Sequence, residues 1–125
     1  MKPKPTASEL EILQILWKNT QCTVREVNEL LTQVRDSEVG YTTTLKLMQI
    51  MHEKGLVERD VSNRTHKYKA SISHENISQG ILQTLIDTVF NGSAAQLVMQ
   101  ALSDKKSSKE EIRKIKEYLD QLEKK

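Results

Sequence analysis

The chain has 125 residues, of which 37% are hydrophobic, 29% charged and 4% aromatic, with one cysteine and a formal net charge of +2. These values fit one small domain with a helical extension and exclude a disordered, collagen-like or disulfide-rich chain. Because no apolar run exceeds three residues, we expect no membrane insertion and no secretory signal, and a cytoplasmic location fits the single cysteine.

Positive charge is concentrated in residues 41–72, which hold six Lys and Arg residues against three acidic ones. An excess of this size is as consistent with an ordinary solvated surface as with a nucleic-acid-binding surface. Charge alone therefore does not decide between these two interpretations.

Two capping boxes predict the starts of the first two helices. In Thr6-Ala7-Ser8-Glu9 and in Thr23-Val24-Arg25-Glu26, a hydroxyl and a carboxylate three residues apart can satisfy each other's backbone amides. Apolar residues recur at helical spacing after each box, to about residue 19 and residue 34. A polar turn over residues 36–40 separates the second helix from a third.

The third predicted helix covers residues 41–54 and ends at Gly55. Thr44, Leu47, Met48 and Met51 fall on one face at spacings typical of a buried stripe, where the methionines serve as core filling. Thr42, Lys46, Gln49 and Glu53 fall on the opposite face, with Thr43 beside them.

After Gly55 the pattern changes to two short candidate strands, residues 56–61 and 65–70. Residues 62–64 separate them, and Asn63 suits a positive φ in a tight hairpin. Two such strands are barely stable alone, so we expect them to lie against the helices.

Residues 73–125 return to a helical pattern, with breaks near residues 91–93 and 103–107. Each of these helices has one apolar face, but together they supply too little apolar surface for a separate core. We therefore predict two domains. The first domain covers residues 1–72, and a helical dimerisation domain covers residues 73–125. The predicted dimerisation residues are Ile77, Ile81, Leu85, Ile112, Ile115, Leu119 and Leu122. Packing of these faces against the first domain is the alternative.

Three helices followed by a β-hairpin are the element order of a winged helix-turn-helix, so we predict a mainly α fold with a small β-hairpin wing. The third helix of that fold enters the DNA major groove, where short donors and acceptors near its N-terminus reach base edges. A basic wing suits the DNA backbone or the minor groove. The predicted DNA-binding residues are Tyr41, Thr42, Thr43 and Lys46 on the helix and Arg64, Lys67 and Lys69 on the hairpin.

These features predict a homodimeric transcriptional repressor that binds a palindromic operator in double-stranded DNA. The alternative is a winged-helix module that binds a protein and has no sequence-specific DNA binding. That alternative predicts an apolar outer face on the third helix, and the polar face in the sequence favours DNA.

No pattern in the chain indicates an enzyme, a metal site or a cofactor. The glycines are isolated, so no phosphate-binding loop is formed. His52, His66 and His74 have no cysteine or carboxylate at metal-ligand spacing. Cys22 fits a small buried thiol better than a nucleophile.

The motifs also resemble one known family. These are residues 6–13 with Leu16-Trp17, then residues 23–27, and Tyr41-Thr42-Thr43-Thr44 leading into Lys54-Gly55-Leu56-Val57. With Tyr68 and residues 90–93, they resemble the penicillinase-repressor family of winged-helix transcriptional regulators over nearly the whole chain. The resemblance implies a cytoplasmic repressor with a dimerising C-terminal domain, an inverted-repeat operator, and base contacts from Thr42, Thr43 and Lys46.

The chain departs from that family at two functional positions. A sensor-protease pathway cleaves the antibiotic-responsive members at an Asn-Phe bond, but Gln100-Ala101 stands at the matching position here. The copper-responsive members carry a C-terminal cysteine cluster, whereas this chain has only Cys22. Neither induction route is therefore expected for this protein.

Overall fold

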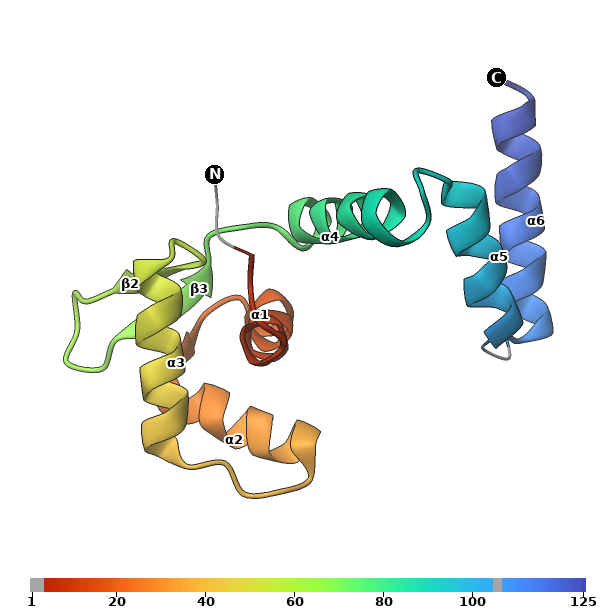
Figure 1. Cartoon of the computed structure of the whole chain (residues 1–125). Helices are drawn as coiled ribbons and strands as arrows, with labels where there is room; N and C mark the ends of the chain where they lie inside the picture. The colour runs from red at the N-terminus through yellow and green to blue at the C-terminus, as the bar shows by residue number, and fades with distance from the viewer. Residues whose placement is uncertain (1–3, 105–106) are drawn as a thin grey trace. The chain divides into compact units, whose positions relative to one another are not determined.

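The computed structural model describes residues 4–104 and 107–125, which form helices and one small sheet (Figure 1). The helices are α1 (Ala7–Asn19), α2 (Val24–Arg35), α3 (Tyr41–Glu53), α4 (His74–Val89), α5 (Ala94–Asp104) and α6 (Lys109–Glu123). The strands are β1 (Cys22–Thr23), β2 (Val57–Asp60) and β3 (Lys67–Ala70). The chain forms two compact units, Met1–Gln79 and Gly80–Lys125, which divide within α4.

Capping boxes fix the starts of α1 and α2, as predicted. The Thr6 hydroxyl accepts from the Glu9 amide at 3.2 Å, and the Glu9 carboxylate accepts from the Thr6 amide at 2.8 Å. Thr23 and Glu26 make the same reciprocal pair at the start of α2. These bonds satisfy amides that a helix start otherwise leaves without partners, so both helices begin where their local sequence directs.

The hydrophobic core of the first unit lies where α1, α2 and α3 meet the sheet. Met48 and Met51 are fully buried in it, which confirms their predicted role as core filling. Tyr68 of β3 is also buried, and the Trp17 indole donates to the carbonyl oxygen of Ile72 at 2.8 Å. The hairpin therefore packs on the helices, as two short strands require.

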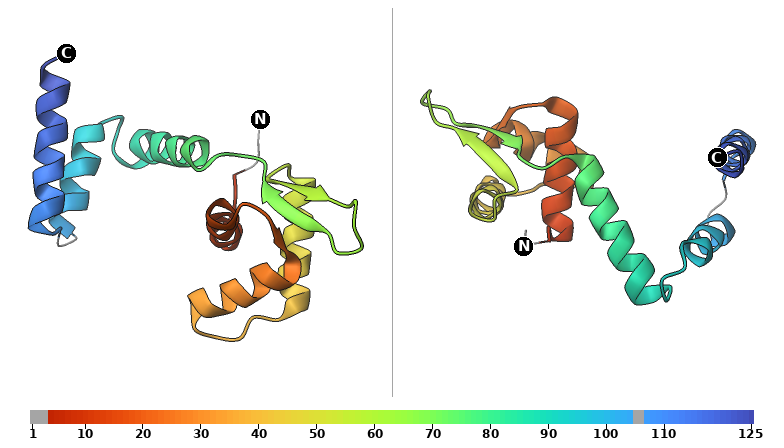
Figure 2. Two further views of the ribbon diagram at one scale, coloured as in Figure 1. Left: turned by 180° about the vertical axis from the view of Figure 1, so that it is seen from behind. Right: turned by 90° about the horizontal axis from the view of Figure 1, so that it is seen from above.

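The sheet is antiparallel and three-stranded, in the order β1-β3-β2, and Figure 2 shows it from two further directions. Cys22 pairs with Tyr68 in β3, while Arg59 of β2 pairs with the same tyrosine from the other side. The structure confirms the predicted mainly α fold with a β-hairpin wing. It adds β1, which the sequence did not indicate, because a strand of two residues is too short to show alternation.

The hairpin turn differs from the prediction. The strands are shorter than expected, so residues 61–66 form a longer loop, and Asn63 does not have a positive φ. The Asp60 carboxylate instead starts the turn by accepting from the Ser62 amide at 2.9 Å and the Ser62 hydroxyl at 2.7 Å. A longer loop spreads the reversal over more residues, so no left-handed residue is needed at Asn63.

The second unit contains α5, α6 and the part of α4 from Gly80 onward. No residue of α6, and none of α4, is buried in the single chain. The predicted break after α4 is confirmed, since Asn91 and Gly92 both adopt positive φ there. The functional boundary predicted between residues 72 and 73 stays a prediction; the division between the units lies at Gln79 and Gly80.

Candidate nucleic-acid interface

The outer face of α3 carries the side chains that the sequence assigned to DNA bases. Thr42, Thr43 and Lys46 are all exposed, whereas Thr44, Met48 and Met51 on the opposite side are buried. Tyr41 begins the helix with 48% of its surface exposed. The hydroxyl and ammonium groups therefore face outward in the single chain, as major-groove contacts require.

Two further residues share this outer face. Gln49 lies one turn beyond Lys46 and is exposed, and Ile50 beside it is 37% exposed. Glutamine can bind adenine through two hydrogen bonds, and an aliphatic side chain can contact a thymine methyl group. The helical spacing had placed Gln49 on this face, but the predicted contacts stopped one turn earlier.

A groove of about 350 Å³ joins α2, α3 and the loop of the hairpin. Of the predicted DNA-binding residues, it brings together Tyr41 and Arg64. It also adds Arg25 and His66, which no sequence pattern had assigned to DNA. The two arginines offer donors suited to a phosphate group. Three separate segments form this groove, so spacing along any one of them did not predict it.

Lys67 and Lys69 line a different hollow, of about 260 Å³, together with Glu58 and Asp60. They alternate with the buried Tyr68 along β3, so they share the opposite face of that strand. The Lys69 ammonium lies 3.4 Å from a Glu58 carboxylate oxygen, its cross-strand partner. Thus the structure does not place these lysines in the groove with Tyr41 and Arg64.

Hydrogen bonds and nearby charges lower the pKa values of two acidic groups around the hairpin. Bonds from Ser62 lower the pKa of Asp60, with a smaller contribution from the charge of Lys67. Hydrogen bonds from Thr23 lower the pKa of Glu26, and the charge of Lys67 lowers it further. Both carboxylates are therefore charged at neutral pH and offset part of the positive charge of Lys67.

An ion pair ties the C-terminal end of α3 to the start of α1. The Lys54 ammonium lies 2.6 Å from a Glu9 carboxylate oxygen, and the Glu9 side chain is only 3% exposed. Burial by itself would raise the pKa of Glu9, but the bonds from Lys54 and Thr6 outweigh it, and the pKa lies below its ordinary value. This pair therefore fixes the C-terminal end of α3.

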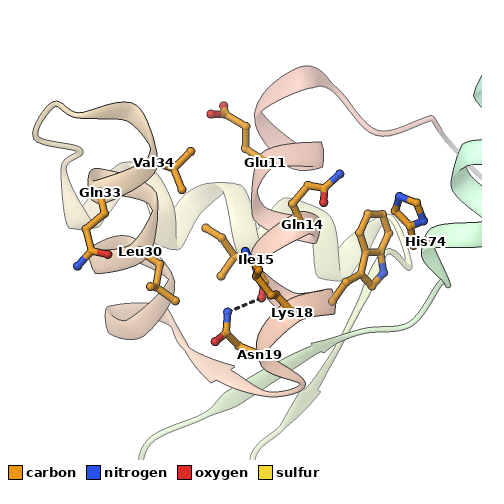
Figure 3. Close-up of a pocket in the computed structure, with 10 residues that line it drawn as sticks. Glu11, Gln14, Ile15, Lys18, Asn19, Leu30, Gln33, Val34 and His74 are labelled. Atoms are coloured by element: carbon orange, nitrogen blue, oxygen red, sulfur yellow. Dashed lines mark hydrogen bonds between the residues drawn. The ribbon is translucent and has the colours of Figure 1, made fainter. Parts of the chain in front are cut away.

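A groove of about 580 Å³ lies between α1 and α2 (Figure 3). Leu30 and Val34 of α2 lie on one side, Ile15 of α1 on the other, and His74 at one end. The His74 and Trp17 rings meet edge to face with their centroids 5.0 Å apart. None of the predicted DNA-binding residues lines this groove, so we do not include it in the interface.

The predicted dimerisation residues form apolar strips along α4 and α6. Ile77, Ile112 and Ile115 are half-buried. Ile81 and Leu85 are each 40% exposed, Leu119 is 50% exposed and Leu122 is 45% exposed. Tyr118 adds a further exposed apolar surface to α6, at 61%. The single chain therefore leaves much of these strips open to solvent.

Four remaining predictions concern other parts of the chain. Cys22 is buried and free, and burial followed by the charge of Glu26 raises the pKa of its thiol, as expected of a structural cysteine. Gln100 and Ala101 lie within α5. Across residues 4–104 and 107–125, no three or more His, Cys, Asp or Glu side chains group to hold a metal ion. Over the same residues, no helix is both long and apolar enough to cross a bilayer.

A three-helix core, a three-stranded sheet and an exposed polar face on α3 define a winged-helix DNA-binding regulator. The family model described as penicillinase repressor matches residues 5–121. The chain belongs to this family, and it is a transcriptional repressor rather than an enzyme.

Curated relatives and solved structures agree with this assignment. The penicillinase repressor of Staphylococcus aureus is 20% identical over 119 residues, covering 94% of this chain and 92% of the relative. That of Bacillus licheniformis is 22% identical over 120 residues, covering 95% and 91%. A structure of RosR from H. salinarum has a TM-score of 0.54 at 21% identity, covering 83% of this chain and 96% of RosR. The complex structure of RosR-S4 has a TM-score of 0.53 at 22% identity, covering 80% and 88%. At these identities, the two structures support the fold alone.

Proposed function

We propose that the protein is a homodimeric repressor in which α3 of each copy enters the major groove of one half of a palindromic operator. The observation that supports this most directly is the outward polar face of α3, on which Thr42, Thr43 and Lys46 are exposed. Tyr41 and the two threonines discriminate between bases, and Lys46 reaches a guanine or a phosphate. Because this face is polar, it does not suit the alternative of a protein-binding module.

The hairpin supplies backbone attraction beside the helix. Arg64 contacts phosphate from the groove that it shares with Tyr41, and Arg25 and His66 line the same groove. Lys67 and Lys69 add positive charge from the other side of the hairpin, where Glu58 and Asp60 reduce their effect. Phosphate contacts of this kind set the position of α3 on the duplex.

Dimerisation rests on the open apolar strips of α4 and α6. A second copy would cover side chains such as Leu85 and Leu119, whose exposure in the single chain is unfavourable. Ile112, Ile115, Leu119 and Leu122 follow a short coiled-coil spacing. We therefore assign DNA binding to residues 1–72 and dimerisation to residues 73–125. We expect the dimer to act in the cytoplasm, where bacterial promoters lie.

The test is selection of bound duplexes from a random library by the purified full chain, followed by titration of variants against the selected sequence. We expect an inverted repeat whose half-sites are one or more helical turns apart. Thr43→Ala should relax the preference among base variants at one position of each half-site by about 1–3 kcal/mol. Gln121→Ala, at an exposed polar position of α6 outside the predicted contacts, is the matched control. Failure to enrich any sequence would contradict the proposal.

A further inference from the structure

Asn28 of α2 lies where the first turn of α3 and the preceding loop come together. Its side-chain nitrogen donates to the carbonyl oxygen of Val39 at 2.9 Å and to the Thr44 hydroxyl at 2.9 Å. The Val39 carbonyl can only accept a hydrogen bond, so the amide nitrogen, not the amide oxygen, must face it. Both hydrogens of one amide group are therefore used to join α2 with two points around the start of α3.

A second side chain of α2 completes this contact. Thr32, one helical turn after Asn28, accepts from the Val39 amide at 3.3 Å. Both backbone polar groups of Val39 are thus bound by side chains from one face of α2. Val39 is 8% exposed, so water is largely excluded and these bonds satisfy groups that would otherwise be costly to bury. We call Asn28, Thr32, Val39 and Thr44 the turn clamp.

The helix α3 needs such support because its N-terminus has no side-chain cap. The N-cap residue of α3 is Gly40, which makes no side-chain capping bond. In contrast, α1, α2 and α6 each begin with a capping box. The bonds from Asn28 to Val39 and Thr44 bracket the start of α3, and Thr44 is fully buried. The placement of the first turn is therefore set from α2.

We propose that Asn28 is a positioning residue for base recognition, acting through the turn clamp on Thr42 and Thr43. This inference rests on the proposed function of α3. The two threonines immediately precede Thr44, so movement of the buried Thr44 would turn them relative to the base edges. Hydrogen bonds to bases depend strongly on donor–acceptor distance and angle, whereas attraction to phosphates is long-range. Loosening the clamp therefore lowers sequence discrimination without lowering general DNA affinity.

The decisive comparison uses two substitutions of one buried residue. Thr44→Val keeps the shape of the side chain but removes the acceptor for Asn28, whereas Thr44→Ser keeps the hydroxyl. The full chain is titrated with the duplex selected by the parent and with a scrambled duplex of the same composition. For Thr44→Val we expect the ratio of the two dissociation constants to fall about tenfold. The scrambled-duplex affinity and its salt dependence should stay unchanged, and Thr44→Ser should match the parent.

Each outcome separates the clamp from a purely structural role. Each variant's urea unfolding curve is measured first, and titrations are made only where the variant is folded. If Thr44→Val keeps the parental ratio, or if Thr44→Ser loses it equally, the inference is overturned. Thr32→Val, which removes the acceptor for the Val39 amide, is the second variant if Thr44→Val does not fold, and it should also lower the ratio. A parent that prefers no duplex would overturn the proposed function itself.

Discussion

Glu9 shows how a buried charge is tolerated in a small core. Its carboxylate accepts from the Thr6 amide and pairs with Lys54, so it acts both as a helix cap and as an anchor for α3. A lone carboxylate at this depth would favour its protonated form. The sequence predicted the capping bond because that bond is local. The pair with Lys54 could not be predicted, because it joins residues that only the fold brings together.

We predict that Glu9 makes the stability of the first unit depend on acidic pH. Because the pKa of Glu9 is lowered in the folded chain, its contribution is present above about pH 4.5 and is lost as the pH falls through the folded value. The free energy of unfolding, measured with urea at a series of pH values, should therefore depend on pH differently in the parent and in Glu9→Gln below about pH 4.5. The glutamine variant should lose less stability over this interval.

Asp60 and Glu26 also have lowered pKa values, but they are present in both proteins. The difference between the two curves therefore isolates Glu9. Parallel curves between pH 5 and the acid limit of folding would contradict this account.

At the scale of elements, the local sequence predicted the positions of the first three helices. For the hairpin it predicted two strands but not their exact bounds or their register. Apolar spacing and capping boxes are contained within one helix, so the bounds of α1, α2 and α3 were predictable. The pairing of Lys69 with Glu58 depends on the register between β2 and β3, which alternation along one strand does not define. The role of Arg25 was not predicted either, because its groove is formed by three segments that only the fold brings together.

The two faces of the hairpin lead to a prediction about salt dependence. Arg64 lines the groove with Tyr41, so Arg64→Ala should remove one phosphate contact per copy. The slope of log affinity against log salt concentration should then decrease in magnitude by roughly one unit for each phosphate lost. Lys69 is already paired with Glu58, so Lys69→Ala should change the slope less.

The measurement is a titration of labelled duplex at several salt concentrations. Arg113→Ala is the control, because Arg113 is an exposed arginine of α6 whose guanidinium lies 3.6 Å from Glu110. An Arg64→Ala slope equal to that of the control would remove this arginine from the interface.

At the scale of the whole molecule, the two units differ in how their apolar residues are covered. The first unit buries residues such as Leu13 and Met48 completely, while the apolar side chains of α6 remain half-buried or exposed. The apolar spacing predicted both sets of residues. It could not show which partner covers the second set, because a helix face has the same pattern against any partner.

We predict that charges placed on the α6 strip separate the dimer. A combined Leu119→Lys and Leu122→Lys chain should sediment at a lower mass and bind the selected duplex more weakly, because one copy offers only one recognition helix. Gln121→Lys adds a charge to the same helix at a polar position and is the control. A dimer that persists with both lysines would place the interface elsewhere, as on Ile81 and Leu85 of α4.

Gly80 stands at the division between the two units, inside α4. A methyl group built there would meet no atom within 4 Å, so packing does not explain a glycine at this position. Glycine in a helix interior costs roughly 0.5–1 kcal/mol relative to alanine. We therefore expect Gly80→Ala to raise the helical content measured by circular dichroism and to stiffen the link. Inserting one base pair between the half-sites should then weaken operator binding by the Gly80→Ala variant more than by the parent. An equal loss of affinity in both proteins would contradict this.

With a flexible α4 at Gly80, one repressor can bind operators of slightly different length without altering the surface that contacts the bases. Flexibility of α4 would then increase the number of promoters that the repressor can control. The outer face of α3 would still determine the sequence required in each half-site.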